Sequence, residues 1–318
     1  MRALPPLLVV AGPTATGKTG LSIHLAEALA TEGVTAEIIS ADSRQVYRGL
    51  DIGTAKVTAA DRARVPHHGL DLVEPDVAFS VADFAAHASD ALTGIAERGG
   101  LAILVGGTGL YLRAVARGLD TAALPHDPDV RARIETEIDT RGLSAAVQRL
   151  GVLAPLAAAR TDLKNPRRVA RALETAELRG DVAPPVPRGY GGPVAWLGLD
   201  VDRDTHREWI TKRARAQFKA GLVEEARALR ERFDPGLRAF SAVGYREAWA
   251  VIDGRSSLQA AIDENIRRNV AFARRQRTWF RSEPDITWLD ATAGPLPQAR
   301  YAAERLMAPL RRPGPPGA

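Results

Sequence analysis

Residues 12–19 read GPTATGKT, that is Gly12-Pro13-Thr14-Ala15-Thr16-Gly17-Lys18-Thr19. The stretch matches the pattern G-x-x-x-x-G-K-[ST], and it lies between an apolar run and a helical pattern, as a phosphate-binding loop requires. Glycines let backbone N–H groups turn toward an anion, and the following helix directs the positive end of its dipole there. A chance glycine turn would lack these flanking patterns. We therefore expect residues 12–19 to bind a diphosphate or polyphosphate, with Lys18 as a cation and Thr19 as a ligand of Mg²⁺.

Short apolar runs alternate with helical patterns along the chain. The runs expected to form strands are 7–10, 36–39, 101–105 and 194–199. Such runs are typical of parallel strands that are buried on both faces. The first helical pattern repeats Leu21, Leu25 and Leu29, which places one apolar stripe against a sheet. The sequence therefore predicts an α/β fold with a P-loop NTPase-like core of parallel strands.

The segment 120–193 contains only helical patterns. Pairs suited to a helix start occur at Asp127-Pro128 and Asn165-Pro166, and glycines suited to helix ends follow at 142 and 180. We interpret 120–193 as an inserted α-helical domain, with a linker rich in Pro and Gly from 181. The core is then formed by 1–119 and 194–308, and residues 309–318 are expected to be a disordered tail.

Two long helical patterns follow the last predicted strand. The second spans about 258–281, and Arg267, Arg274 and Arg281 recur in it every seven residues, with Arg268 and Arg275 beside them. A polyanion could lie along these arginines, although a solvated charged face is the simpler interpretation. The first pattern predicts one helix whose apolar face is formed by Phe218, Leu222, Ala226, Leu229 and Phe233.

Composition narrows the class of protein. The chain has 318 residues, no cysteine and six scattered histidines, which excludes disulfides and gives no support to a zinc site. No apolar run approaches the roughly 20 residues that cross a bilayer, so we expect a cytoplasmic protein without membrane contact, and a monomer. The net charge of +5 and a pI of about 9.8 favour a polyanionic partner.

The surroundings of the loop differ from those of a nucleotide hydrolase or kinase. Such enzymes place an acid at the end of a second apolar strand to organise Mg²⁺. Here the run 101–105 leads into Gly106-Gly107-Thr108-Gly109 without Asp or Glu. Asp42 follows the run 36–39, and ligands bind where the carboxyl ends of parallel strands meet. We therefore expect Asp42 and Thr108 to face the crevice above the loop.

A held anion, a carboxylate and a hydroxyl suit a displacement in which diphosphate leaves while Asp42 takes a proton from the nucleophile. Simpler interpretations remain open, because Asp42 suits an Asx-turn or a helix cap and Thr108 suits a tight glycine turn. We interpret His67 and His68 as turn or packing residues rather than as ligands.

Further motifs extend the pattern over most of the chain. They are GPTATGKT from Gly12, ISADSRQVYRGLDIGTAK from Ile39, PHHGLD from Pro66, FSVADF from Phe79, LVGGTGLYLRA from Leu104, DPDVRARI from Asp127, NPRRVARALE from Asn165, SAVGYREAW from Ser241 and ARRQRTWFR from Ala273. In this order the motifs closely resemble those of the tRNA dimethylallyltransferases, also called tRNA isopentenyltransferases.

The resemblance implies transfer of a dimethylallyl group from dimethylallyl diphosphate to N6 of adenosine-37 in tRNAs that read codons beginning with U. Asp42 is then expected to be the general base, Thr108 to bind at the reacting centre, and the loop with Lys18 and Thr19 to hold diphosphate and Mg²⁺. Arg203 matches a family arginine that we expect on the diphosphate. The adenosine would have to leave the anticodon stack.

The family also marks segments that contact the anticodon stem-loop of tRNA. The matching residues are Asp42, Ser43, Arg44, Gln45, Thr108, Arg131, Arg167, Arg168, Arg171, Ser241, Gly244, Tyr245 and Arg246. Two departures from the family pattern occur, since Asn269-Val270 stands where many members have Thr-Arg and Trp209 stands where an arginine is common.

Three other functions compete with this one. A small-molecule kinase would need the strand-end acid that is missing here, and an adenylate isopentenyltransferase would not need the inserted domain with its arginine cluster. A non-catalytic RNA-binding module would not need the intact Gly17-Lys18-Thr19 together with Asp42.

Overall fold

The computed structural model describes residues 4–121, 125, 127–183 and 186–308. Within these residues, the strands form one parallel sheet of order β3-β2-β4-β1-β5-β6. The strands are β1 (Leu7–Ala11), β2 (Ala36–Ser40), β3 (His67–His68), β4 (Leu101–Gly106), β5 (Val194–Asp200) and β6 (Ile286–Asp290). The predicted α/β fold and its four predicted strands are confirmed. The pattern did not predict β3 and β6, because β3 is very short and the edge strand β6 is mostly exposed.

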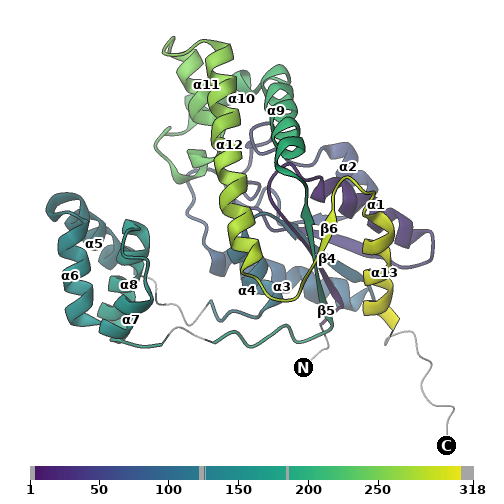
Figure 1. The fold of residues 1–318 in the computed structure, drawn as a ribbon, viewed down its shortest axis with the longest axis horizontal. Coiled ribbons are helices and arrows are strands. Elements are labelled where there is room, and N and C mark those ends of the chain that lie inside the picture. The colour runs from purple at the N-terminus through teal and green to yellow at the C-terminus, as the bar shows by residue number, and fades with distance from the viewer. Residues whose placement is uncertain (1–3, 122–124, 126, 184–185, 309–318) are drawn as a thin grey trace, which may run out of the picture. The chain divides into compact units, whose positions relative to one another are not determined.

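Helices cover both faces of the sheet (Figure 1). They are α1 (Lys18–Ala30), α2 (Ala59–Arg64), α3 (Val81–Glu97), α4 (Gly109–Ala116), α9 (Arg203–Lys219), α10 (Leu222–Arg232), the 3₁₀ turn η1 (Arg238–Ser241), α11 (Tyr245–Ile252), α12 (Leu258–Arg281) and α13 (Leu296–Met307). Alternate residues of each strand point to opposite faces. Leu8 and Val10 therefore pack with α1 and α13, whereas Leu7 and Val9 pack in the larger core with α3 and α4.

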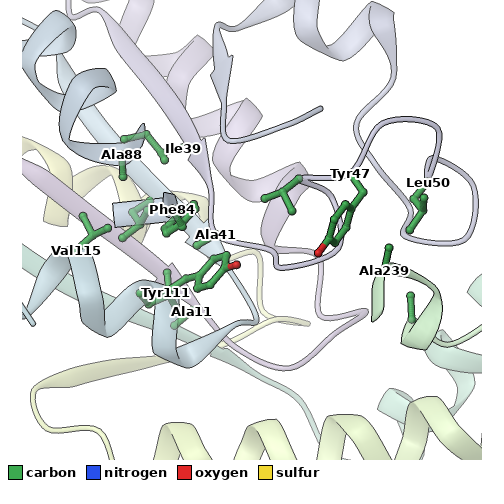
Figure 2. Packing of buried hydrophobic residues seen from close by; sticks show 14 of the residues in the cluster. Ala11, Ile39, Ala41, Tyr47, Leu50, Phe84, Ala88, Tyr111, Val115 and Ala239 are labelled. Atoms are coloured by element: carbon green, nitrogen blue, oxygen red, sulfur yellow. The ribbon is translucent and has the colours of Figure 1, made fainter. Parts of the chain in front are cut away.

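The larger core reaches from the sheet to the loop that follows β2. Figure 2 shows Tyr111 of α4 beside Phe84 of α3, close to Ala11 and Ala41 at the strand ends. The rings of Phe84 and Tyr111 stack with centroids 4.2 Å apart, and all of these side chains are buried. This packing fixes the carboxyl ends of β1 and β2, where the site residues begin.

The predicted helix with an apolar face from Phe218 to Phe233 is wrong in one respect, because the chain forms two helices there. The helix α9 ends at Lys219 and α10 begins at Leu222. Gly221 between them has φ +102°, a left-handed conformation that glycine adopts without strain. The apolar periodicity continues across the break because both helices bury side chains in the same core.

Residues Leu119–Arg188 form a separate compact unit, whereas the predicted insertion runs from 120 to 193. Its helices are α5 (Pro128–Arg141), α6 (Leu143–Leu153), α7 (Pro155–Arg160) and α8 (Pro166–Arg179). The predicted helix starts are confirmed, since Asp127 accepts from the amide of Asp129 at 2.9 Å and Asn165 from that of Arg167 at 3.1 Å. A small core formed by residues such as Ile134, Leu150 and Leu173 holds the unit together. The predicted disordered tail, 309–318, lies outside the described residues.

The pairing of β2 with β4 predicts that a side chain at position 106 destabilises the fold. A Cβ there would lie 2.1 Å from the carbonyl oxygen of Ala41, so β2 and β4 would have to separate. We expect Gly106→Ala to lower the free energy of unfolding by about 1–3 kcal/mol, as overpacking does. Urea denaturation measures the change. Gly20→Ala is the control, because a Cβ at that helical position meets no atom within 4 Å. Equal urea midpoints for G106A and the wild type would contradict this account.

Candidate active site

The phosphate-binding loop follows β1 and has a backbone that few residues can adopt. Gly12 has φ +143°, and a Cβ there would lie 2.6 Å from the carbonyl oxygen of Leu199 in β5. Gly17 has φ +82° and is the N-cap residue immediately before α1. Ala15 has φ +64°, which costs conformational energy in a residue other than glycine. The surrounding contacts must therefore hold the loop in this shape.

Two side chains from distant helices hold Thr14 in the loop. The Gln276 Oε1 atom on α12 accepts from the Thr14 amide at 2.8 Å, and Gln276 Nε2 donates to the Gly107 carbonyl at 2.9 Å. On the other side, His206 Nε2 of α9 donates to the Thr14 carbonyl at 2.8 Å, and Arg277 donates to His206 Nδ1. This second contact fixes a neutral imidazole, in agreement with a pKa that burial lowers. The sequence motifs contain Gln276 but not His206, and they do not reveal this role.

The loop and the ends of β2 and β4 enclose a cavity of about 290 Å³, here called the phosphate cavity. Lys18 lies in its wall, where its Nζ donates to the carbonyl of Pro13 at 2.6 Å. Burial lowers the pKa of Lys18 to about 7; the nearby Arg213 contributes in the same direction, and Asp42 partly opposes it. The site thus holds a poorly solvated cation that an anion would stabilise.

The carboxylate of Asp42 has two roles in the geometry. Its Oδ1 accepts from the Arg44 amide at 2.8 Å, which is the Asx-turn that was the simpler interpretation. The same side chain lines the phosphate cavity and a second cavity of about 430 Å³. We call the second one the acceptor cavity. The Asx-turn therefore orients Asp42 and leaves it accessible to ligands in both cavities.

Thr108 also faces the acceptor cavity, as expected. Its hydroxyl accepts from the Ser43 amide at 3.1 Å, and its own amide donates to the Ala41 carbonyl at 3.3 Å. These bonds tie the residues after β4 to those after β2. The hydroxyl proton of Thr108 is left to donate to a ligand in the cavity.

The glycines around Thr108 permit close approach rather than merely a tight turn. A Cβ on Gly107 would lie 2.3 Å from Gln276 Nε2, and one on Gly109 would lie 2.4 Å from the ring of Trp279. Both neighbours belong to α12. The motif therefore lets this helix reach the phosphate-binding loop.

Arg213 is the cation that sequence reasoning missed. It lies on α9, lines both cavities, and its Nη2 donates to Asn269 Oδ1 at 3.4 Å. Burial lowers its pKa, against the opposing effect of Asp42. Arg203, which we expected on the diphosphate, lies at the start of α9 and lines a separate cavity with Arg277. At 1.5 Å per residue, the two α9 arginines are roughly 15 Å apart along the helix.

Asn269, one of the residues that depart from the family pattern, contacts Arg213. Asn269 is buried on α12, accepts from Arg213, and donates to Asn265 Oδ1 at 2.7 Å. It therefore orients the missed arginine. For Val270 and Trp209, both half-buried, the structure gives no such role.

The predicted tRNA-contacting residues of the core fall into three groups: residues that line a cavity, one exposed residue and buried residues. Ser43, Arg44, Thr108 and Ser241 line the acceptor cavity, and Arg246 is exposed. Gln45 lies in the wall of the phosphate cavity, where its Nε2 donates to the Thr54 carbonyl. Two others support the fold: Gly244 has φ +122°, and the fully buried Tyr245 donates its hydroxyl to Glu225 at 2.8 Å.

The arginines expected along α12 lie partly in the site. Arg267, Arg268 and Arg275 line the acceptor cavity, although Arg267 pairs with Glu264 and Arg268 with Glu247. Arg274 is exposed, and Arg281 lies 3.8 Å from Asp200 outside the cavity. The cavity wall is thus strongly basic.

In the separate unit, two predicted contact residues are held by a buried carboxylate. Arg131 and Arg171 both donate to Glu174, which also accepts from the Asp127 amide. Burial opposes ionisation of Glu174, but the amide and the two arginines lower its pKa below the usual value. Arg167 and Arg168 are exposed in the first turn of α8. These two are therefore the more available cations.

The two histidines of the PHHGLD motif differ. His68 pairs with Glu37 at 2.7 Å, which supports its interpretation as a packing residue. His67 Nδ1 donates to the Val65 carbonyl at 2.7 Å, while its ring lines the phosphate cavity. Its Nε2 is buried without a hydrogen-bond partner among the described residues.

Fold and site together define an α/β protein of the phosphate-binding-loop class, with a basic cavity for a second substrate beside the anion site. Within that class, the family model described as IPP transferase matches residues 45–283. The chain belongs to the IPP transferase family, which confirms the resemblance of its motifs. In the part of the chain that the structure describes, each helix is too short or too polar to cross a membrane.

Named relatives agree with this family. The chain is 40% identical over 293 residues to the tRNA dimethylallyltransferase of Halalkalibacterium halodurans, covering 90% of this chain and 91% of the relative. It is 44% identical over 308 residues to the tRNA dimethylallyltransferase of Roseiflexus castenholzii, covering 94% and 97%.

Solved structures show the same fold. The tRNA isopentenylpyrophosphate transferase of Bacillus halodurans superimposes with a TM-score of 0.68 at 36% identity, covering 96% of this chain and 99% of that one. A eukaryotic dimethylallyltransferase acting on tRNA superimposes with a TM-score of 0.75, covering 97% of this chain and 80% of that one. At 22% identity, this second likeness supports the fold alone.

The pKa of Lys18 leads to a prediction for anion binding. With a pKa of about 7 in the free protein, Lys18 is protonated below that pH and must take up a proton to hold an anion above it. We expect the Kd for inorganic diphosphate to rise by up to about tenfold per pH unit above 7. Calorimetric titration from pH 6 to 9 measures it.

The control for this titration is Lys18→Arg, whose guanidinium stays charged across the range and so reports the ionisation of diphosphate itself. Only the difference between the two profiles belongs to Lys18. Parallel profiles for K18R and the wild type would show that Lys18 is already charged in the free protein.

Proposed function

We propose that the protein transfers a dimethylallyl group from dimethylallyl diphosphate to N6 of adenosine-37 in tRNAs that read codons beginning with U. The observation that carries the proposal is the position of Asp42, which lines both the phosphate cavity and the acceptor cavity. A carboxylate at this junction can reach a nucleophile that attacks a carbon attached to a diphosphate in the loop. The family and the names of its relatives support the same reaction.

In this reaction the N6 nitrogen attacks C1 of the dimethylallyl group and forms the new N–C bond. The C1–O bond breaks, and the diphosphate leaves with its electron pair. The N6 proton passes to the carboxylate of Asp42, which acts as a general base. Loop amides, Lys18 and Arg213 stabilise the negative charge that develops on the leaving oxygen.

The acceptor must enter the second cavity as a single base, because N6 in a stacked anticodon loop is not accessible to Asp42. The basic wall of that cavity, with Arg267, Arg268 and Arg275, suits the phosphates that flank an extruded adenosine. Arg167 and Arg168 of the inserted unit offer a further surface for the same polyanion. Because tRNA is the substrate, we place the protein in the cytoplasm.

A magnesium ion fits the site as a partner of the diphosphate. Thr19 is exposed in the first turn of α1 beside the cavity and would supply one hydroxyl ligand. Among the described residues, no cluster of three or more His, Cys, Asp or Glu side chains could hold a metal by itself. Diphosphate oxygens and water would supply the other oxygen ligands that Mg²⁺ prefers. When bound, the ion would neutralise part of the charge on the diphosphate.

The direct test uses purified protein, dimethylallyl diphosphate, Mg²⁺ and an unmodified tRNA with adenosines at positions 36 and 37. We expect mass spectrometry to show one added dimethylallyl group on this tRNA, and none on a tRNA with guanosine at position 37 or on free AMP. Modification of AMP alone would favour the adenylate isopentenyltransferase, and ATP turnover without tRNA would favour the kinase. No added mass, beside a working enzyme as positive control, would refute the proposal.

Substitution of Asp42 separates its two roles. Asp42→Asn keeps an Oδ1 acceptor for the Arg44 amide but loses the base. We expect kcat to fall by about 10²- to 10⁴-fold, the usual contribution of a general base, while the Kd for tRNA changes little. Single-turnover kinetics and filter binding measure the two quantities. Asp42→Ala, which also loses the turn, serves for comparison. An equal loss of rate and affinity in D42N would exclude the base assignment.

A further inference from the structure

The phosphate cavity and the acceptor cavity share part of their walls, a region here called the neck. The residues that line both cavities are Thr14, Asp42, Thr54, Arg213, Phe272 and Gln276. All but Phe272 carry a hydroxyl, carboxylate, guanidinium or amide group. The neck of a polar, basic site therefore contains one hydrocarbon side chain.

Phe272 is not placed there by packing of its helix. The buried side of α12 is formed by residues three or four apart, such as Asn269, Ala273 and Gln276, and Phe272 lies beside that stripe. The residue is 38% exposed, although it is large and aromatic. The guanidinium of Arg275 lies 5.9 Å from the centroid of its ring. The ring is thus held at the cavity wall and is open to the cavity.

The reaction places a hydrocarbon group in the neck. This step rests on the proposed function: the diphosphate lies in one cavity and the attacking nitrogen in the other, so C1 must lie between them, near Asp42 and Arg213. The rest of the dimethylallyl group is apolar and branches within a few ångströms of C1. As the C1–O bond lengthens, positive charge spreads over the allylic carbons, and the face of an aromatic ring attracts such charge.

We propose that Phe272 is the residue that contacts the dimethylallyl group and determines which prenyl chains are accepted. Its ring covers apolar surface of the substrate that would otherwise face water or charged side chains, and it favours the transition state over the ground state. By filling one side of the neck, the ring also leaves no room for an allylic chain that continues beyond five carbons.

The first test separates the contribution of the prenyl group to binding from that of the diphosphate. We expect Phe272→Ala to weaken binding of the unreactive dimethylallyl S-thiolodiphosphate by about tenfold, as loss of hydrophobic contact does, with unchanged affinity for inorganic diphosphate. Phe272→Leu, which keeps apolar volume, should retain most of the affinity. Val57→Ala is the matched control, because Val57 lines the phosphate cavity but not the neck, and it should not discriminate between the two ligands.

The second test measures chain-length selectivity with geranyl diphosphate as the longer donor. We expect F272A to raise the ratio of kcat/KM for geranyl over dimethylallyl diphosphate by at least about tenfold, while V57A leaves the ratio unchanged. The KM for tRNA should stay the same in each variant. Circular dichroism and thermal melting confirm that each variant folds, and Phe272→Val, which also removes the ring, carries the test if F272A does not fold.

The outcomes distinguish the two proposals. If the wild type modifies no tRNA, the proposed function fails, while the binding comparison between thiolodiphosphate and diphosphate still tests Phe272. If the wild type is active but F272A binds both ligands as the wild type does, or weakens both equally, the assignment of Phe272 is overturned. A selective loss in V57A instead would place the prenyl group against the inner wall of the phosphate cavity and would overturn it as well.

Discussion

The hydrogen bonds of Gln276 are the contacts on which the rest of the site depends. A phosphate-binding loop directs its amides at a ligand, so it cannot satisfy them within itself and must be shaped from outside. The side-chain amide of Gln276 bonds both to Thr14 of the loop and to Gly107 after β4. His206 donates to the carbonyl of Thr14 from the opposite side. Both side chains come from helices late in the chain. The site near the N-terminus is therefore complete only when α9 and α12 have packed against the sheet.

The packing of α9 and α12 against the sheet also determines the electrostatics of the site. The same two helices carry Arg213 and three further arginines of the acceptor cavity, and α9 places Arg213 beside Lys18. Burial lowers the pKa of both cations, which means that their charges are poorly solvated before a ligand binds. Such a site is preorganised for an anion, since diphosphate replaces the missing solvation without rearrangement of the protein. Asp42 opposes both shifts, so the carboxylate proposed as the general base lies within the same electrostatic field.

Sequence reasoning succeeded where function is local and failed where it depends on tertiary contact. The loop from Gly12 to Thr19, the four strands and the helix caps at Asp127 and Asn165 follow from spacing and residue type alone. Arg213 could not be predicted in this way. Its helix contains several basic residues, and the sequence does not mark which of them faces a cavity formed by the distant phosphate-binding loop. Tyr245 shows the opposite error, since a conspicuous motif residue is buried as support. In the sequence Phe272 is indistinguishable from other apolar residues of its helix, and only the structure shows that it lines the neck.

The structure also explains why the strand-end acid of nucleotide hydrolases is missing. Such an acid would stand at Gly106 or Gly107, at the end of β4. A side chain at Gly106 would meet the carbonyl of Ala41 at 2.1 Å, and one at Gly107 would meet Gln276 at 2.3 Å. The close pairing of β2 and β4 thus excludes a carboxylate from position 106, and the approach of α12 that shapes the loop excludes one from position 107. The remaining carboxylate, Asp42, follows the neighbouring strand β2 and lies at the junction of the phosphate cavity with the acceptor cavity. These two steric constraints leave the end of β4 without an acid, and Asp42 is then the carboxylate that we propose takes the proton of the second substrate as diphosphate leaves.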